Sequence, residues 1–270
     1  MELIKYIFLG IIQGITEPIP VSSSGHLLLF QKLLKGLDTI DYEILATITN
    51  FGSLLAITIL FRKQIFKLFK GFFGYLKTKE KKYYDDYKYS WYIIIATIPA
   101  GVMGILVKKL GILDFLEENI KFVGLTLLIT SIFLFIIKDF KGIKSNKEIT
   151  QKDAITIGLF QVVALLPGIS RSGATIVGGM FRNLKREVAF DFSFILYIPI
   201  SIATAILGIK DLLEASLSLT QYLFYGISMV MAFIFTYIGT IWFKNIVKNG
   251  KLIYFVIYCI IVGSLIILFL

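Results

Sequence analysis

The sequence has only one cysteine and one histidine in 270 residues, and charged residues make up only 17% of it. A single cysteine, Cys259, excludes a disulfide within the chain. The sequence also lacks the C-x-x-C, H-E-x-x-H, Walker and G-x-S-x-G patterns, which argues against the commonest zinc, P-loop and serine-hydrolase sites. Its start lacks a basic region followed by a small-residue cleavage site, so we expect no removable signal peptide.

Apolar residues dominate instead. They make up 57% of the chain, against roughly 45–50% in soluble domains. Six apolar segments approach the roughly 20 residues that a spanning helix needs, and they cover residues 42–61, 91–107, 122–137, 190–209, 221–243 and 252–270. The composition therefore predicts an all-α, multi-pass integral membrane protein, with the lipid bilayer as its surroundings.

The net charge of +10 comes from basic residues that lie between these apolar segments. Loops over residues 62–88 and 138–152 hold many of the lysines, and basic loops mark the cytoplasmic side of a membrane. Contact with an anionic leaflet explains this charge better than nucleic acid does, so we expect no nucleic-acid partner. The mixed-charge loops after residues 107 and 209, the first with Asp114, Glu117 and Glu118, are then on the outside.

The stretch QGITEPIPVSSSGH, residues 13–26, places polar groups inside an apolar region. Pro18 and Pro20 each remove a backbone donor and interrupt a helix. The three serines that follow suit the start of a new helix, whose free N–H groups form an anion site. Because ionisable groups at membrane depth are costly, Glu17 and His26 are predicted to be functional.

A second stretch repeats the first at a constant offset of 148 residues, so that residues 158–173 echo residues 10–25. The copies differ in chemistry, because Glu17 corresponds to Leu165 and Ser23 to Arg171. Duplicated, broken helices are typical of membrane proteins with a site near the midplane. We therefore expect a single membrane domain, residues 1–270, with inverted-topology repeats of about 1–138 and 149–270. Each repeat contributes one re-entrant helix hairpin, and about six full transmembrane helices complete the fold.

If the two breaks meet, they form a site for phosphate chemistry. The planar fork of Arg171 suits phosphate oxygens, and the serines and helix starts add donors that stabilise phosphoryl transfer. Glu17 is a candidate base or cation ligand, and His26 a candidate base or nucleophile.

Each candidate also has a structural interpretation. Ser22 and Ser24 suit helix caps, and a lone histidine such as His26 is often a packing residue. Arg171 is also a suitable ion-pair partner for Glu17. Gln13 and Gln161 suit the role of partners for backbone groups freed at the breaks.

Both stretches resemble the signature motifs of the bacterial undecaprenyl-diphosphatase, or bacitracin-resistance, family. The first resembles its Glu/Gln-x-x-x-Glu element, here Gln13 and Glu17, with the Ser-Ser-Gly-His end that follows. The second, residues 167–175, resembles its Pro-Gly-x-Ser-Arg-Ser-Gly-Ala-Thr element. The resemblance implies hydrolysis of undecaprenyl diphosphate, a polyprenyl lipid, to undecaprenyl phosphate for cell-wall synthesis, and bacitracin resistance. It also implies a bacterial plasma-membrane location with a site open to the outer face.

The resemblance further implies a divalent cation, Mg²⁺ or Ca²⁺, held at Glu17. It places catalysis on Glu17, Ser22, Ser23, His26 and Arg171, and substrate binding on Gln13, Ser24, Gly25, Ser170, Arg171, Ser172, Gly173 and Thr175. Gln13 departs from members that have two glutamates, which puts a carboxylate pair in doubt.

The residues alone leave three alternatives open. A lipid-phosphate transporter also uses inverted repeats with broken helices, but it does not need the whole set of Glu17, His26, Arg171 and a serine. A structural scaffold gives no reason for polar groups at this depth. The nucleophile stays undecided between His26, a serine and water, and a homodimer is one assembly that the sequence leaves open.

Overall fold

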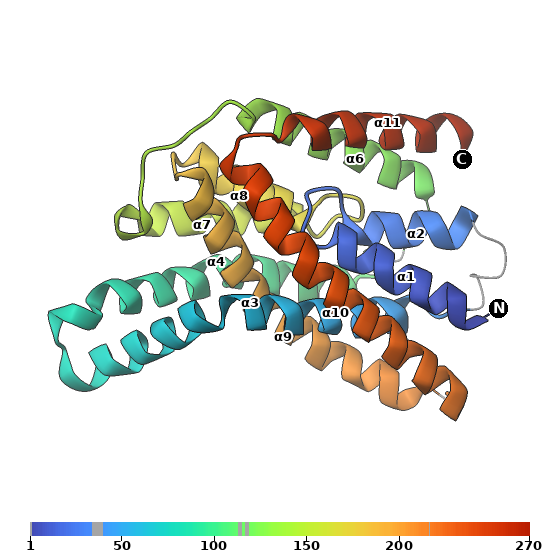
Figure 1. Cartoon of the computed structure of the whole chain (residues 1–270), viewed down its shortest axis with the longest axis horizontal. Helices are drawn as coiled ribbons and strands as arrows, with labels where there is room; N and C mark the ends of the chain where they lie inside the picture. Colours follow the sequence, from blue (N-terminus) through green and yellow to red (C-terminus); the bar gives the residue numbers. More distant parts are fainter. Residues whose placement is uncertain (1, 34–39, 113–114, 117–118, 216) are drawn as a thin grey trace.

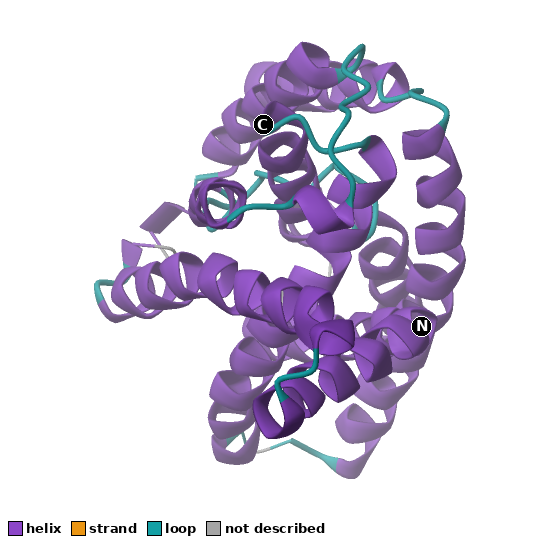
Figure 2. Cartoon of the chain, turned by 90° about the vertical axis from the view of Figure 1, so that its left-hand side faces the viewer, coloured by secondary structure: helices purple, strands orange, loops and turns teal. Residues whose placement is uncertain are grey.

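The computed structural model describes residues 2–33, 40–112, 115–116, 119–215 and 217–270. Within them, Figure 2 shows helices and connecting loops and no strand. The predicted outer-loop residues Asp114, Glu117 and Glu118 lie outside the described part. The α-helices of the described part are α1 (Glu2–Thr16), α2 (Ser23–Leu33), α3 (Tyr42–Thr78), α4 (Tyr84–Lys109), α6 (Ile120–Ile137), α7 (Gln151–Val163), α8 (Arg171–Phe181), α9 (Arg186–Glu214), α10 (Leu219–Lys248) and α11 (Ile253–Phe269).

These helices confirm the prediction of an all-α membrane protein. Five of them, within the described part, are long and apolar enough to cross a bilayer: α3, α4, α6, α9 and α10. The α11 helix is apolar but only 17 residues long. It runs beside α6 (Figure 1), where Gly124 and Gly263 allow the two backbones to touch. A Cβ added at Gly263 would lie 2.8 Å from the carbonyl oxygen of Gly124.

Both predicted helix breaks are present. The first separates α1 from α2 over residues 17–22, and the second separates α7 from α8 over residues 164–170. The α2 and α8 helices each have eleven residues, and Arg171 begins α8 148 residues after Ser23 begins α2. The structure therefore contains two short helical hairpins, while their re-entry into a membrane stays a prediction.

The two hairpins exchange partners across the molecule. The α1 helix packs against α10, from the second half of the chain, and α7 packs against α4, from the first half. Glycines at equivalent positions bring each pair close. A Cβ at Gly10 would lie 2.4 Å from the Ser228 carbonyl oxygen, and one at Gly158 would lie 2.7 Å from that of Ala96. This exchange supports the inverted duplication, which itself stays a prediction.

The prediction of a basic loop over residues 62–88 is wrong. The α3 helix continues to Thr78, a short 3₁₀ turn follows at Lys81–Tyr83, and α4 begins at Tyr84. Lysines recur among apolar residues over 62–78 without proline, and lysine and leucine are good helix formers. The helix stops where Lys79 adopts a left-handed conformation, with φ of 56°. The basic charge is therefore carried on a helical hairpin.

Asp153, in the first turn of α7, is a buried ionic centre that fixes the base of the second hairpin. Its side chain is fully buried. It accepts hydrogen bonds from Lys144 Nζ at 3.0 Å, Arg182 Nε at 2.8 Å and the Thr150 amide at 2.9 Å. Burial by itself would raise the pKa of Asp153, but these donors outweigh it and hold that pKa below its usual value.

We expect Asp153→Asn to lower the free energy of unfolding by about 1–3 kcal/mol, because it removes the anionic partner of two partly buried cationic side chains, Lys144 and Arg182. A depressed pKa stabilises the fold above the unfolded-state pKa of about 3.9. Wild-type stability should therefore fall as pH drops below about 4, and the variant should lack this part of the loss. Thermal unfolding in detergent at several pH values tests both points. The exposed Asp85→Asn is the control, and equal stability of the two variants would contradict the role of Asp153.

Candidate active site

The two helix breaks meet at a cavity of about 340 Å³. Two contacts hold them together. A Cβ at Gly25 would lie 3.2 Å from the Gly168 Cα, and one at Gly173 would lie 3.1 Å from the Pro20 Cβ. Both predicted glycines therefore serve the junction of the breaks. The cavity is lined by both breaks and by α1, α2, α3, α8 and α9. Its polar side chains come from Gln13, Thr16, Glu17, Ser22, Ser23, Ser24, Tyr42, Thr47, Asn50, Ser170, Arg171, Ser172, Tyr197, Ser201 and Thr204.

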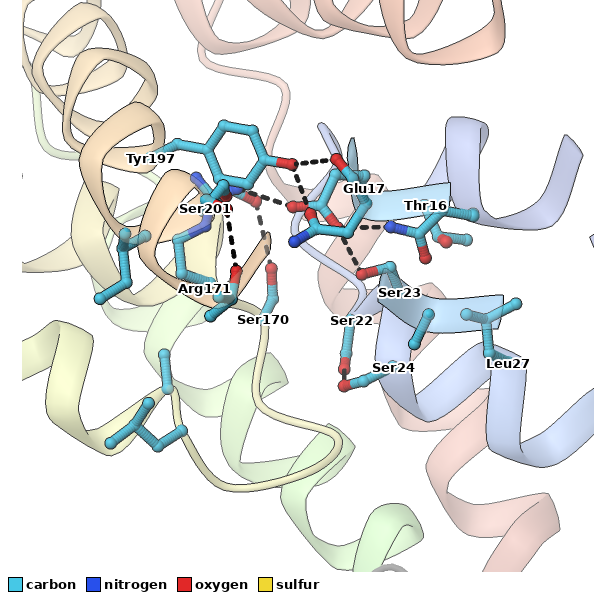
Figure 3. Close-up of a pocket in the computed structure, with 18 of the residues that line it drawn as sticks. Thr16, Glu17, Ser22, Ser23, Ser24, Leu27, Ser170, Arg171, Tyr197 and Ser201 are labelled. Atoms are coloured by element: carbon cyan, nitrogen blue, oxygen red, sulfur yellow. Dashed lines mark hydrogen bonds and ion pairs between the residues drawn. The ribbon is translucent and has the colours of Figure 1, made fainter. Parts of the chain in front are cut away.

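Ser22 shapes the first break. Its backbone has a φ of 69°, a left-handed conformation that is uncommon for residues other than glycine. Its hydroxyl accepts a hydrogen bond from the Gly25 amide at 3.2 Å and lies 3.3 Å from the hydroxyl of Ser24. Ser22 thus caps α2, as its structural interpretation predicts, and the turn leaves Ser23 facing the cavity (Figure 3).

Ser170 has the same position in the second break. It caps α8 by accepting a hydrogen bond from the Gly173 amide at 3.1 Å, and its hydroxyl lies 3.2 Å from that of Ser172. The preceding turn needs glycine, because Gly168 has a φ of 87° and a Cβ there would lie 2.0 Å from the Thr126 hydroxyl. Thr126 donates to the carbonyl of Pro167 at 2.7 Å. The α6 helix therefore fixes this break in place.

Glu17 is the centre of the polar network (Figure 3). Arg171 Nη2 donates to its Oε1 at 2.7 Å, and the Ser23 hydroxyl donates to its Oε2 at 2.6 Å. Gln13 Nε2 also donates to Oε2, at 3.0 Å. The Glu17 side chain is only 9% exposed. The predicted ion pair between the two breaks is confirmed, and Gln13 supports the carboxylate.

Arg171 retains an unused donor. Its Nη1 is buried and has no hydrogen-bond partner among the described residues. The guanidinium lies over the ring of Tyr197, 3.9 Å from its centroid. The Tyr197 hydroxyl donates to Asn50, whose side-chain oxygen lies 2.5 Å away and whose backbone carbonyl oxygen lies 3.2 Å away. Stacking and ion pairing therefore fix the plane of the guanidinium, and Nη1 remains available for an anion.

Tyr197 and Asn50 were missed by the sequence prediction. Both come from apolar spanning segments, where a single aromatic or amide residue gives no pattern. The only signal in the sequence was their polarity at membrane depth, which many other residues of the chain share.

His26 does not face the cavity. Its Nδ1 lies 2.7 Å from the Ser22 carbonyl oxygen, and its Nε2 lies 2.6 Å from the hydroxyl of Tyr258 on α11. The two rings also stack, with centroids 5.6 Å apart. Both ring nitrogens are thus engaged, and the imidazole is buried. This geometry favours the packing interpretation of His26, whose catalytic role stays a prediction.

Two further predicted residues lie away from the cavity. Thr175 donates to the Arg171 carbonyl oxygen at 2.9 Å and contacts the hydroxyl of Ser193, so it braces α8 from behind. Gln161 does not satisfy freed backbone groups as its structural interpretation predicts. Its side chain is buried, and neither its nitrogen nor its oxygen has a hydrogen-bond partner in the described part.

Few side chains in the cavity could act as ligands for a metal cation. Among the described residues that line the cavity, Glu17 is the only carboxylate, and the described part has no cluster of three or more His, Cys, Asp or Glu placed to hold a metal. Mg²⁺ is often held by one or two carboxylates together with substrate phosphates and water. Glu17 and the neighbouring serine hydroxyls fit such a shared site but not a metal cage made of protein alone.

Comparison with known proteins now identifies the relatives of this chain. The family model described as "Bacitracin resistance protein BacA" matches residues 6–265. The chain belongs to the BacA family. It is similar to undecaprenyl-diphosphatase 1 of Bacillus licheniformis, with 45% identity over 100% of this chain and 98% of the relative. Undecaprenyl-diphosphatase 2 of Bacillus thuringiensis is 44% identical over 99% and 98% of the two chains. The undecaprenyl-diphosphatase of Oceanobacillus iheyensis is 40% identical over 99% and 97%.

Both motifs that resemble this family lie inside the matched region and form the cavity. The BacA family assignment therefore rests on nearly the whole chain, and the polar network belongs to its central part.

Proposed function

We propose that this protein hydrolyses undecaprenyl diphosphate to undecaprenyl phosphate and inorganic phosphate. The observation that carries the proposal is the Ser23–Glu17–Arg171 network, which joins a hydroxyl, a carboxylate and a guanidinium in one cavity. The identity of the lipid substrate is inferred from the BacA-family relatives, which are named undecaprenyl-diphosphatases. The product is the carrier lipid of cell-wall synthesis, and abundant enzyme confers bacitracin resistance by restoring it.

The geometry supports a mechanism in which Ser23 is the nucleophile. Its hydroxyl already donates to Glu17 at 2.6 Å, so the carboxylate is placed to take the proton as a general base. The oxygen of Ser23 then bonds to the terminal phosphorus, the bond from phosphorus to the bridging oxygen breaks, and undecaprenyl phosphate leaves. Glu17 passes its proton to the departing undecaprenyl phosphate and is again a carboxylate. It then accepts a proton from the water that attacks the phosphoserine. The bond from phosphorus to the Ser23 oxygen breaks, Ser23 takes the proton back from Glu17, and inorganic phosphate leaves.

Arg171 stabilises the charge on the transferred phosphoryl group. Its Nη1 offers the unpaired donor, and Nη2 can exchange Glu17 for a phosphate oxygen. The first residues of α2 and α8 line the same cavity, and the positive ends of the two helix dipoles favour an anion there. A lipid-phosphate carrier would need only such binding groups. The Ser23–Glu17 pair adds an activated nucleophile, so hydrolysis is the favoured function.

Phosphate release from undecaprenyl diphosphate by purified protein in detergent tests the proposal. We expect steady turnover on this lipid and little on soluble phosphate esters, because the cavity is also lined by apolar side chains such as Leu27, Leu165 and Ile200. Binding of the lipid without phosphate release would reject a phosphatase and favour the carrier.

We propose that a divalent cation, Mg²⁺ or Ca²⁺, is held by Glu17 together with the diphosphate oxygens. The cation supplies charge neutralisation for phosphoryl transfer. We expect a chelator to lower phosphate release, with recovery on addition of either cation. Gln13→Glu should reduce the cation concentration needed for half-maximal rate, because it places a second carboxylate beside Glu17. Gln13→Leu is the control, and full activity in chelator would contradict the proposal.

We propose that the protein lies in the bacterial plasma membrane with the cavity open to the outer face. Tyr42 and Ala205 line the cavity, near the ends of α3 and α9 that lie opposite the basic segments. A cysteine at Lys77 should react with an impermeant thiol reagent only after the cells are opened, and one at Glu214 should react in intact cells. Native Cys259 is buried, so it adds little background. The reverse labelling pattern would overturn this orientation.

A further inference from the structure

The α3 helix is longer than a membrane requires. Its 37 residues extend about 55 Å at 1.5 Å per residue, whereas the hydrocarbon core of a bilayer is about 30 Å thick. The end of α3 pairs with the start of α4 to form a helical arm, residues 62–91. Figure 1 shows this arm, in turquoise at the lower left, extending beyond the other helices. The cavity and its chemistry do not use it.

One face of the arm is an exposed apolar stripe. Its members are Phe66, Phe69, Phe73 and Leu76, which are between 44% and 69% exposed. Their spacing of three and four residues places them on one side of α3. A patch of large apolar side chains that projects beyond the body of a protein marks a contact surface.

An apolar groove of about 340 Å³ borders this stripe. It lies between α3, α4 and α9, and its walls include Leu68, Phe72, Ile93, Ile195 and Pro199. The polar residue that lines the groove is Ser90, and its hydroxyl donates a hydrogen bond to the Asp86 carbonyl oxygen at 2.8 Å. The groove therefore offers contact to a hydrocarbon chain and no hydrogen bonds.

Basic and aromatic residues surround these apolar surfaces. Lys63, Lys70 and Lys77 are exposed on α3, and helical spacing places them along the edge of the stripe away from the groove. Trp91 and Tyr87 on α4 lie against Phe72, with ring centroids 5.9 Å and 5.4 Å away. Tryptophan and tyrosine are enriched at the headgroup level of a bilayer.

We propose that this arm binds anionic phospholipids of the adjacent leaflet. The stripe and groove take acyl chains, and the three lysines bind the phosphate headgroups. The charge decides between a lipid and a second copy of this chain. A second copy would bring the same basic arm to the interface, because nine Lys and Arg face only three Asp and Glu over residues 62–91, and like charges across an interface disfavour association. An anionic leaflet complements them instead.

Lipid quenching of Trp91 tests this inference without using activity. The chain has two tryptophans, so Trp242→Phe leaves Trp91 as the only reporter. In nanodiscs, brominated phosphatidylglycerol should quench Trp91 more strongly than brominated phosphatidylcholine at the same mole fraction. An anionic surface gives up to about a fivefold gain in binding per lysine. The triple variant Lys63→Gln, Lys70→Gln, Lys77→Gln should therefore lose most of this preference.

The matched control changes three exposed lysines of other segments, Lys141, Lys152 and Lys251, to glutamine. It carries the same net charge as the triple variant and should keep the preference for the anionic lipid. Equal quenching by the two lipids in the parent protein, or equal loss in both triple variants, would overturn the proposal. Disulfide cross-linking between copies through Phe69→Cys in lipid would also overturn it, because the stripe would then be a dimer interface.

Discussion

Ser23→Ala protein, purified in detergent, is expected to release phosphate from undecaprenyl diphosphate at least about a thousandfold more slowly than wild type. The substitution removes the hydroxyl that donates to Glu17 at 2.6 Å and leaves the backbone of the break unchanged. Ser23 does not cap α2, since Ser22 does so. The loss should therefore appear in kcat with a similar thermal unfolding temperature.

Ser24→Ala is the matched control. Ser24 lines the same cavity, and its hydroxyl lies 3.3 Å from that of Ser22. We expect a loss of less than about tenfold, in keeping with one neutral hydrogen bond.

The nucleophile can be identified by trapping the phosphoenzyme. When wild-type protein is quenched rapidly during turnover of lipid radiolabelled in its terminal phosphate, labelled phosphate should be found on Ser23. Near-normal turnover by Ser23→Ala, together with loss of turnover in folded His26→Gln, would instead assign the attack to His26.

The arrangement of the breaks could be predicted because local chemistry sets it. Pro18 and Pro20 cannot continue α1, and serines at the starts of α2 and α8 satisfy free amides at each new helix. The repeat at an offset of 148 residues then predicted that the two breaks meet and that Glu17 and Arg171 lie close together. Their ion pair is present, with 2.7 Å between Arg171 Nη2 and Glu17 Oε1. Composition was enough to predict the all-α membrane class.

Other features depend on contacts that no local pattern carries. The partner of His26 is Tyr258, 232 residues away, so the sequence could not show whether the imidazole faces the cavity. Tyr197 and Asn50 meet only because α3 and α9 pack together. The length of α3 was misjudged because lysines among apolar residues suit both a loop next to a membrane and an amphipathic helix.

Arg171→Lys is expected to lower phosphate release by roughly a hundredfold to a thousandfold, the loss typical of one transition-state donor. Lysine keeps the charge and can still reach Glu17, but it has no planar fork for two phosphate oxygens. It also cannot stack flat on Tyr197 as the guanidinium does, 3.9 Å from the ring centroid. The effect should fall mainly on kcat, because the unpaired Nη1 is used most when the phosphoryl group carries its greatest charge.

Variants of Tyr197 test how much of the effect of Arg171 depends on the orientation of its guanidinium, because they leave the charge of Arg171 unchanged. The Tyr197→Phe variant keeps the ring under the guanidinium and loses the hydroxyl that donates to Asn50, so we expect a loss of no more than about tenfold. Tyr197→Leu removes the stacking surface as well and should approach the defect of Arg171→Lys. Both are measured as kcat and KM for undecaprenyl diphosphate on protein shown to be folded by thermal unfolding. Normal kcat in folded Arg171→Lys would mean that charge alone is sufficient, and the fixed guanidinium plane would then have no part in phosphoryl transfer.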